Sequence, residues 1–317
     1  MRKILFFIVI FTATAAFTQN GADTLKPWKV SGIGSLTINQ ASFSNWSPGG
    51  ENSLSATAFL KFYADYTRDK FSFNNTVNLK YGMINSESES LKKNEDLIEL
   101  ISQYNHNLSK HWSASALVNF NTQFANGYNY PDDSTVISTF MAPAYLTIAP
   151  GVLYKPVDYF SILFAPISMR SIIVMDQDLA DIGAFGVDKA DTLSDGSIDR
   201  GTGKNSKFKL GTFVEFYFKK EIKTDLAIES KLNLFYNYLQ DNNIPNGVNP
   251  VDFNWETFIN YKISKWFSAN LFVHLAYMPG DVFIERGNDL NGNTITVSPN
   301  DKLQIKQSFG IGLAYNF

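Results

Sequence analysis

The hydrophobic residues of this chain recur at every second position over long stretches downstream of Trp28. Between Phe208 and Phe218, one face reads Phe, Leu, Thr, Val, Phe, Phe, and the other face reads Lys, Gly, Phe, Glu, Tyr. The stretch from Leu303 to Phe317 alternates in the same way. A period of two is the pattern of β-strands with one apolar face, so the sequence predicts an all-β protein.

The length of the alternating runs favours membrane strands over soluble ones. Many runs continue for about 10 to 15 residues, whereas strands of soluble proteins usually run about 5 or 6. Strands that cross a membrane at a tilt need roughly 9 to 11 residues. Alternation alone also fits a secreted soluble β-protein, which is the alternative to a membrane barrel.

Short polar junctions alternate along the chain with longer polar connections. Short turns on one side and long loops on the other are typical of outer-membrane barrels. The short junctions are Thr67–Lys70, Ser109–His111, Lys155–Asp158, Lys219–Asp225 and Ser264–Lys265, and the long connections cover approximately 42–52, 85–95, 125–143, 175–206, 240–251 and 279–302.

Five short turns and six long loops join about twelve strands, an even number as such barrels require. The strands are expected near residues 35, 60, 77, 102, 118, 149, 166, 213, 232, 258, 272 and 310. The sequence therefore predicts a transmembrane antiparallel β-barrel of about 12 strands, with short periplasmic turns and long extracellular loops.

The first residues have the composition of a secretory signal peptide. A basic start, Met1-Arg2-Lys3, precedes the apolar run 4–11 and then small residues as far as Ala16. That run is far shorter than the roughly 20 residues of a spanning helix, which is the alternative interpretation. We expect residues 1–18 to be removed and residues 19–317 to form a single barrel in the outer membrane of a Gram-negative bacterium.

Composition narrows the possible partners and cofactors. Of 317 residues, 44% are hydrophobic and 15% aromatic, and the formal net charge is −3. Disordered chains do not hold so many aromatic residues, and nucleic-acid binders are normally basic. The chain has no cysteine, which excludes disulfides and cysteine-ligated metals. We expect outer-membrane lipid as a partner, and no cofactor.

The last strand ends in an aromatic residue. Tyr315-Asn316-Phe317 closes an alternating segment. This resembles the C-terminal signal by which outer-membrane barrels are recognised, with Tyr315 and Phe317 as its assembly residues. The resemblance implies contact with the outer-membrane barrel insertion machinery.

The first long loop carries a distinctive motif. It reads Asn45-Trp46-Ser47-Pro48-Gly49-Gly50-Glu51-Asn52, after a strand that ends in Asn39-Gln40. This resembles an uncharacterised family of outer-membrane barrels widespread in Bacteroidota, and the resemblance implies fold and location only. Trp46 either anchors or packs the loop, or contacts a partner. The motif residues are Asn45, Trp46, Gly49, Gly50 and Asn52.

If the apolar stripes face lipid, the alternate positions line the lumen. Their charges are mixed, whereas a strongly selective ion path is expected to show one dominant sign. The lumen is therefore either a salt-bridged interior or a narrow solute path. The lumen-lining candidates are Lys61, Lys80, Glu99, Lys207, Lys209, Glu215, Lys219, Glu229, Lys231, Glu256, Lys262, His274 and Lys306.

Catalytic and metal sites have weak support in the sequence. Among three histidines, only His274 is a credible catalytic residue, and no Ser or Asp partner is evident by spacing. The acidic loop 175–206 is rich in aspartate but lacks the spacing of a calcium-binding loop. We predict no catalytic residue and no metal ligand, and calcium binding by this loop is left open.

Three classes of function remain. The first is a non-enzymatic barrel that acts as a scaffold or subunit of a larger outer-membrane assembly. The second is a narrow channel or transporter for small solutes, lined by lysines such as Lys207, Lys209, Lys219 and Lys231. The third is a barrel enzyme acting on lipid or peptide through His274. We expect the first.

Overall fold

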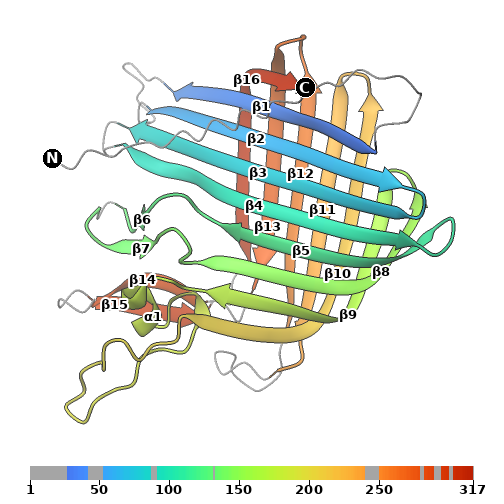
Figure 1. Ribbon diagram of the computed structural model, residues 1–317. Coiled ribbons are helices and arrows are strands. Elements are labelled where there is room, and N and C mark those ends of the chain that lie inside the picture. The colour runs from blue at the N-terminus through green and yellow to red at the C-terminus, as the bar shows by residue number, and fades with distance from the viewer. Residues whose placement is uncertain are drawn as a thin grey trace, which may run out of the picture.

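The chain folds into a closed antiparallel β-barrel of twelve strands (Figure 1). The computed structural model describes residues 27–41, 53–86, 91–130, 133–239, 250–278, 282–288, 294–299 and 303–316. The barrel strands are β1 (Trp28–Ala41), β2 (Ser53–Arg68), β3 (Phe71–Ser86), β4 (Lys92–Asn107), β5 (Trp112–Thr122), β8 (Ala144–Val157), β9 (Phe160–Ile173), β10 (Ser206–Lys223), β11 (Leu226–Asn237), β12 (Val251–Lys262), β13 (Phe267–Tyr277) and β16 (Gln304–Asn316).

Neighbouring barrel strands are also neighbours in the sequence, and β16 closes the barrel against β1. The strands range from 11 residues in β5 to 18 residues in β10, which is long enough to span a bilayer at a tilt. In Figure 1, strands β1 to β5 cross the front of the barrel, and β10 to β13 cross steeply behind them. The predicted fold class and all twelve predicted strands are confirmed.

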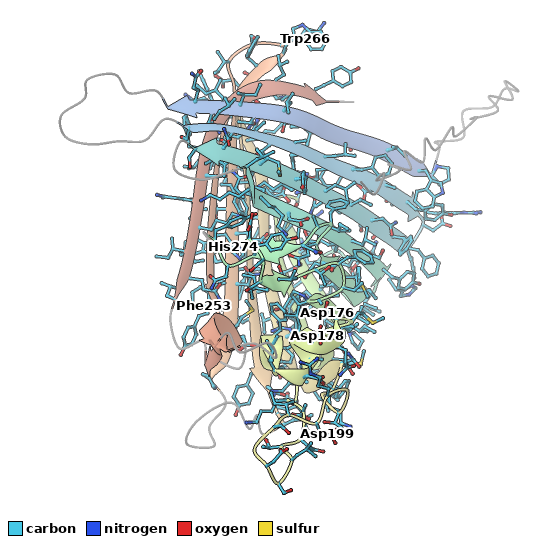
Figure 2. The ribbon with its side chains drawn as sticks, turned by 90° about the vertical axis from the view of Figure 1, so that its left-hand side faces the viewer. Asp176, Asp178, Asp199, Phe253, Trp266 and His274 are labelled. Carbon is cyan, nitrogen blue, oxygen red and sulfur yellow. The ribbon has the colours of Figure 1, made fainter. Side chains whose placement is uncertain are left out.

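The connections lie at two ends of the barrel. Tight turns such as Asp69–Lys70 and Thr224–Asp225 join hairpins at one end, and the segment 174–205 connects β9 to β10 at the other. Figure 2 shows Trp266, from a short turn, and Asp199, from the long loop, at opposite ends of the molecule. By the usual asymmetry of such barrels, the end with short turns is periplasmic.

Two predicted connections are shorter in the structure than the sequence analysis predicted. The loop predicted at 85–95 is shorter, because β3 runs to Ser86 and β4 begins at Lys92. The junction predicted over Lys219–Asp225 is a two-residue turn, because β10 continues to Lys223. In both places charged residues were taken as loop residues, although a barrel strand tolerates charge on its inner face.

The extracellular connections contain small elements of their own. They are the hairpin of β6 (Gly127–Tyr128) and β7 (Val136–Ser138), the helix α1 (Gln177–Asp181), the 3-10 turn η1 (Ala184–Gly186), and the hairpin of β14 (Val282–Asn288) and β15 (Thr294–Pro299). Within the described residues, no helix is long and apolar enough to cross a membrane.

Candidate functional site in the barrel lumen

Alternation along each strand separates an outer apolar face from an inner mixed face. On β10, the outward Phe208 is 51% exposed, whereas the inward Lys209 and Phe213 are each 3% exposed. Large apolar side chains are exposed around the outside, including Leu100, Phe164, Trp255 and Phe309. In water such a surface would be unfavourable, but it matches the lipid-facing band of a membrane barrel.

The centre of the lumen is occupied by Lys231 of β11. Its ammonium nitrogen lies 3.3 Å from the Glu99 carboxylate of β4 and 3.7 Å from that of Glu256 on β12. Glu99 also accepts hydrogen bonds from the side-chain amides of Asn78 and Asn119, at 2.6 and 3.0 Å. Strands β4 and β11 are not neighbours in the barrel. The Lys231–Glu99 pair therefore crosses the interior.

A second group of polar contacts lies nearer the periplasmic end. Lys61 of β2 lies 2.7 Å from Glu229 of β11, which also accepts a hydrogen bond from the Tyr217 hydroxyl. Lys219 donates to the Tyr63 hydroxyl at 3.1 Å and lies over the Tyr63 ring. Because β2 and β11 are also not neighbours, the Lys61–Glu229 pair is a second connection across the lumen.

A third group lies nearer the extracellular end. Glu95 of β4 lies 2.7 Å from Lys306 of β16 and 3.3 Å from Lys80 of β3. His274 lies between Glu256 and Lys306 in strand register, and Figure 2 shows it on the inner side of the barrel. Its Nε2 atom is 2.6 Å from the Asn254 side-chain oxygen and 3.9 Å from the Glu256 carboxylate.

Apolar side chains fill the lumen beside these charges. Leu117, Leu163, Phe213 and Phe235 come from β5, β9, β10 and β11, and each is 3% exposed or less. Arg170 of β9 lies over the Phe235 ring at 4.2 Å and donates to Asp252 of β12 at 3.0 Å. The interior therefore combines an apolar cluster on one wall with ion pairs that reach across to the others.

The extracellular loop between β9 and β10 has a small core of its own. Leu179, Ala180, Ala184 and Val187 pack on Val174 and on Ile172 of the barrel wall. The helix α1 begins after Asp176, whose side chain caps the backbone N–H of Leu179 at 3.1 Å. The loop therefore continues the barrel wall as a packed unit.

Asp181 organises this loop. Burial raises the pKa of its carboxyl group, but hydrogen bonds from the Gly201 N–H, the Gln177 amide and the Gly203 N–H outweigh burial and lower the pKa. The carboxylate holds together three separate points of the loop, and it does so in its charged form. The other loop aspartates do not gather: no cluster suited to a metal ion occurs among the described residues.

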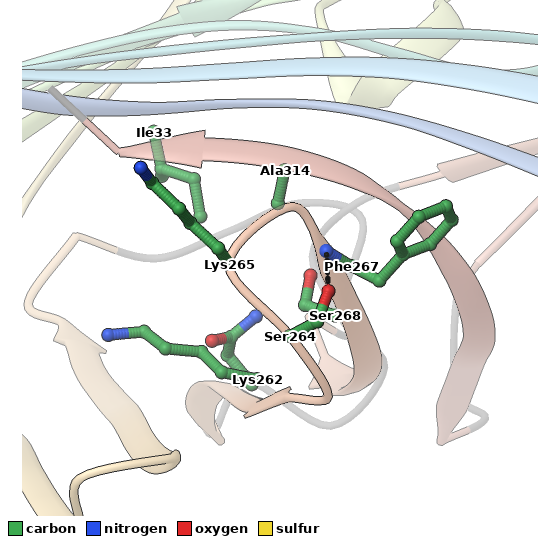
Figure 3. A pocket seen from close by; sticks show the side chains of 8 residues that line it. Ile33, Lys262, Ser264, Lys265, Phe267, Ser268 and Ala314 are labelled. Atoms are coloured by element: carbon green, nitrogen blue, oxygen red, sulfur yellow. Dashed lines mark hydrogen bonds between the residues drawn. The ribbon is translucent and has the colours of Figure 1, made fainter.

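The remaining lumen candidates lie on the inner face, with Glu215 at the middle of the barrel and the others nearer its two ends. Lys207 and Lys209 stand opposite Ile172 and Arg170 of β9 toward the extracellular end, and Glu215 stands opposite Asn233 of β11. Lys262 borders a cavity of about 230 Å³ at the periplasmic end. Figure 3 shows this cavity, where Ser264 accepts a hydrogen bond from the Phe267 N–H. The cavity is lined by Ile33, Asn260, Lys262, Ser264, Lys265, Phe267, Ser268 and Ala314.

Two other predicted groups fall partly or wholly outside the described residues. The loop motif Asn45, Trp46, Gly49, Gly50 and Asn52 lies outside them, as does Phe317. Tyr315 is described, and its ring stacks on that of Trp266 at 5.8 Å near the periplasmic end. Residues 1–18, the predicted signal peptide, also lie outside.

Three charged residues of the lumen network were missed by sequence reasoning. Glu95 was assigned to a loop, and Asp252 lies one residue beyond the predicted loop 240–251. Arg170 lies in a segment where Pro166 interrupts the alternation. Extending each strand by a few residues at constant alternation would have placed Glu95 and Asp252 on the inner face.

The closed strand order, the apolar outer face and the charged interior define a transmembrane β-barrel of the bacterial outer membrane. Residues 38–128 match the family described as "Protein of unknown function (DUF3078)". This part of the chain covers β2 to β5 and the end of β1. No curated protein matches the chain.

Solved structures with a similar arrangement are outer-membrane barrels. An outer membrane channel from Pseudomonas putida F1 is 10% identical, with 94% of this chain and 100% of that chain covered and a TM-score of 0.40. The NanC porin is 7% identical, with coverages of 89% and 98% and a TM-score of 0.35. The translocator domain of the autotransporter NalP from Neisseria meningitidis is 8% identical, with coverages of 95% and 90% and a TM-score of 0.33.

Proposed function

We propose that this protein is a non-enzymatic outer-membrane barrel with a closed lumen, and that it acts as a scaffold or subunit of a larger outer-membrane assembly. The observation that carries the proposal is the set of ion pairs across the lumen. Lys231–Glu99, Lys61–Glu229 and Lys306–Glu95 each join strands that are not neighbours in the barrel. A solute that crosses the lumen would have to separate these ion pairs.

The charges that reach across the lumen support a structural role because each of them meets an opposite charge. The side chains of Lys61, Glu99 and Lys231 are each less than a fifth exposed. Placing such charges out of water is unfavourable unless they are paired and hydrogen-bonded, and here they are. The pairs therefore serve the barrel itself and leave binding to its outer surfaces.

The enzyme alternative has little support in the geometry around His274. Within the described residues, its ring is hydrogen-bonded to Asn254 and lies near Glu256, and no serine hydroxyl is hydrogen-bonded to it. A nucleophilic mechanism requires a hydroxyl or thiol within hydrogen-bond reach of the base. His274 is better explained as a member of the ion-pair network.

A second function, a narrow channel for small solutes, is favoured by the hydration of the extracellular end. The side chains of Lys306, Glu256 and His274 are 45%, 30% and 28% exposed. Water therefore reaches the third group of charges. In a channel, Lys209→Glu would change ion selectivity, because this substitution reverses the charge of a buried inner residue.

The experiment that tests the proposed function is purification of the tagged protein from its native outer membrane in mild detergent, followed by mass determination of the intact particle. The proposal predicts a stoichiometric protein partner. A barrel that elutes alone in several detergents, and that conducts ions in a planar bilayer, would overturn the proposal in favour of the channel.

A further inference from the structure

The cavity at the periplasmic end of the lumen lies beside the turn that joins β12 to β13 (Figure 3). Its volume of about 230 Å³ is well above the roughly 10–15 Å³ that a single water molecule requires. The polar side chains of the lining are Asn260 and Lys262 from β12, Ser268 from β13, and Ser264 and Lys265 from the turn. Among the described residues that line the cavity there is no carboxylate.

Two lysines give the cavity a positive charge. Figure 3 shows the side chains of Lys262 and Lys265 extending to the same side of the turn. Lys265 lies over the Trp266 ring at 5.5 Å, and the backbone N–H of Lys262 donates to the Asp225 carbonyl at 2.7 Å. Within the described residues, neither ammonium group forms an ion pair with Asp225 or with any other carboxylate. They differ in this from the three lysines of the ion pairs across the lumen.

Two serines add hydroxyl groups to the same cavity. The Ser264 oxygen accepts the backbone N–H groups of Trp266 and Phe267, at 3.4 and 3.2 Å. The Ser268 oxygen accepts the side-chain amide of Asn270 at 3.4 Å. Within the part of the chain that the structure describes, neither hydroxyl donates to an acceptor. Because a hydroxyl can accept and donate at once, both hydrogens are left to donate to a ligand.

The inner wall of the cavity is buried and fixed by hydrogen bonds. Ser268 is 2% exposed and Asn260 is 7% exposed. The Asn260 amide donates to the Asn270 side-chain oxygen at 2.6 Å, and its second N–H is left for a ligand. Ile33 and Ala314 supply a small apolar surface. The exposed lysines of the turn therefore stand over a preformed polar wall.

These groups select the charge and chemistry of a ligand. Two ammonium groups without carboxylate partners repel a cation. A wholly apolar ligand would bury the hydroxyl and amide donors without acceptors, which is unfavourable. Carboxylate and phosphate oxygens accept hydrogen bonds from ammonium, hydroxyl and amide groups, and bonds to a charged acceptor are the stronger kind. The lining therefore matches a small oxyanion.

We propose that this cavity binds a small oxyanion with two negative charges, such as free phosphate or a short dicarboxylate, from the periplasm. Lys262 and Lys265 balance its charge, and Ser264 and Ser268 donate to its oxygens. A phospholipid headgroup carries the same phosphate chemistry, but the buried wall belongs to the inner face of β12 and β13, so the ligand is a soluble one. The site lies at one end of the barrel and requires neither an open lumen nor a protein partner.

Calorimetric titration of the purified full chain tests the proposal. The protein would be kept in an uncharged detergent at low ionic strength, because salt screens exposed charges. The probes are inorganic phosphate and succinate, with glycerol as the uncharged control and a short-chain phosphatidylglycerol as the lipid headgroup. We expect saturable one-to-one binding of phosphate and succinate, weaker binding as salt is added, and none of glycerol.

Three variants locate the site. Lys262→Met/Lys265→Met should bind phosphate about tenfold more weakly, since each exposed ammonium group contributes a few-fold. Lys110→Met/Lys155→Met removes the same charge from two other exposed periplasmic turns and should stay within about twofold of the wild type. Ser268→Ala changes no charge and should weaken binding about threefold or more. Heat-dependent gel mobility checks that every variant is folded.

Several results would overturn the proposal. One is the absence of saturable binding of either anion below about 10 mM. Equal losses in the two double variants would show a general attraction to the basic end, and wild-type affinity in Ser268→Ala would show that the buried wall takes no part. Binding of the lipid headgroup without phosphate or succinate would assign the charge to lipid. Purification with a partner and ion conductance test the proposed function alone, so either inference can fail without the other.

Discussion

The ammonium group of Lys231 lies near carboxylates from two other strands of the barrel. It lies within 4 Å of both Glu99 and Glu256, and its side chain is 14% exposed. Removing one member of a buried ion pair leaves the other charge without its partner, which is more costly than removing both.

Replacing Lys231 with Met is expected to destabilise the barrel by about 3–5 kcal/mol, because Glu99 is then left charged and buried. Urea unfolding from phospholipid vesicles measures the difference. The double variant Lys231→Met/Glu99→Gln should lose less than the sum of the two single changes. Lys110→Met, in an exposed turn, is the matched control, and equal losses at the two lysines would contradict the network.

Asp181 gives the extracellular loop a pH dependence. Its folded pKa is lowered by hydrogen bonds from Gly201, Gln177 and Gly203. Its contribution is therefore fully present above the unfolded pKa of about 3.9 and is lost as the pH falls through the lower, folded pKa. We expect protection of the loop against proteolysis to be constant between neutral pH and about pH 5, and to decline below about pH 4.

Asp181→Asn should remove most of this pH dependence and weaken the loop by about 1.5–3 kcal/mol at neutral pH, since hydrogen bonds to a charged acceptor are the stronger kind. Local amide exchange over residues 174–205 measures the effect. Asp188→Asn, at an exposed position of the same loop, should leave it unchanged. A similar change in both variants would show that net charge, not the Asp181 contacts, governs the loop.

Gly211 allows two strands to approach closely at the level of the apolar cluster. A Cβ atom there would collide with the backbone carbonyl of Tyr236 on β11. Gly211→Ala should therefore cost about 1–3 kcal/mol, the usual cost of overpacking. Gly34→Ala is the control, because a Cβ at Gly34 meets nothing within 4 Å. Equal unfolding midpoints for the two variants would contradict the packing at β10.

Among the elements, the seam between β1 and β16 is the shortest strand pairing of the barrel, with five residue pairs from Ile33–Asn316 to Thr37–Gly312, and the cysteine-free sequence makes it easy to probe. Leu36 and Leu313 stand opposite each other in the seam ladder. Directly opposite residues are close enough for a disulfide. Gln40 and Phe309 would be opposite only if the ladder continued.

The pair Leu36→Cys/Leu313→Cys is expected to form a disulfide on mild oxidation of the purified barrel, whereas Gln40→Cys/Phe309→Cys is expected to stay reduced. Gel mobility with and without reductant measures both. Rapid oxidation of the second pair as well would show that the ladder between the two strands continues beyond Thr37 and Gly312.

The strands and their inward charges show which features of the structure could be predicted from the sequence and which could not. The twelve strands were predictable because alternation over 11 to 18 residues is a strong signal. The inner charges of β10 and β11 followed from the same alternation. Glu95, Arg170 and Asp252 did not, because each lies near a strand end or an interrupted pattern.

The pairing of charges could not be predicted at all. Alternation says that Lys61 and Glu229 face inward, but not that they meet across 168 residues of sequence. Such contacts depend on strand register and on how the barrel closes, which one sequence does not specify. The apolar cluster also had no separate signal, because alternation places Phe213 on the face of Lys209 and Glu215 but does not say that it packs against Leu117, Leu163 and Phe235.

At the scale of the whole molecule, the barrel combines a closed interior with a short seam between β1 and β16. Ion pairs join β2 to β11, and β4 to both β11 and β16, so the lumen is braced at three levels. The apolar cluster and the packed loop 174–205 add to this closure on one side. If the proposed function is right, interaction with other molecules takes place at the outer surfaces and the extracellular loops.

The lumen of the wild-type barrel is proposed to be closed to ions, and ion conductance in a planar lipid bilayer measures whether it is. In 0.15 M KCl, roughly the physiological ionic strength at which partly buried pairs are little screened, the inserted wild-type barrel should give no steady current steps. The triple variant Lys61→Met/Lys231→Met/Lys306→Met should give them. A steady, ohmic conductance from the wild-type barrel, unchanged in the triple variant, would contradict the claim.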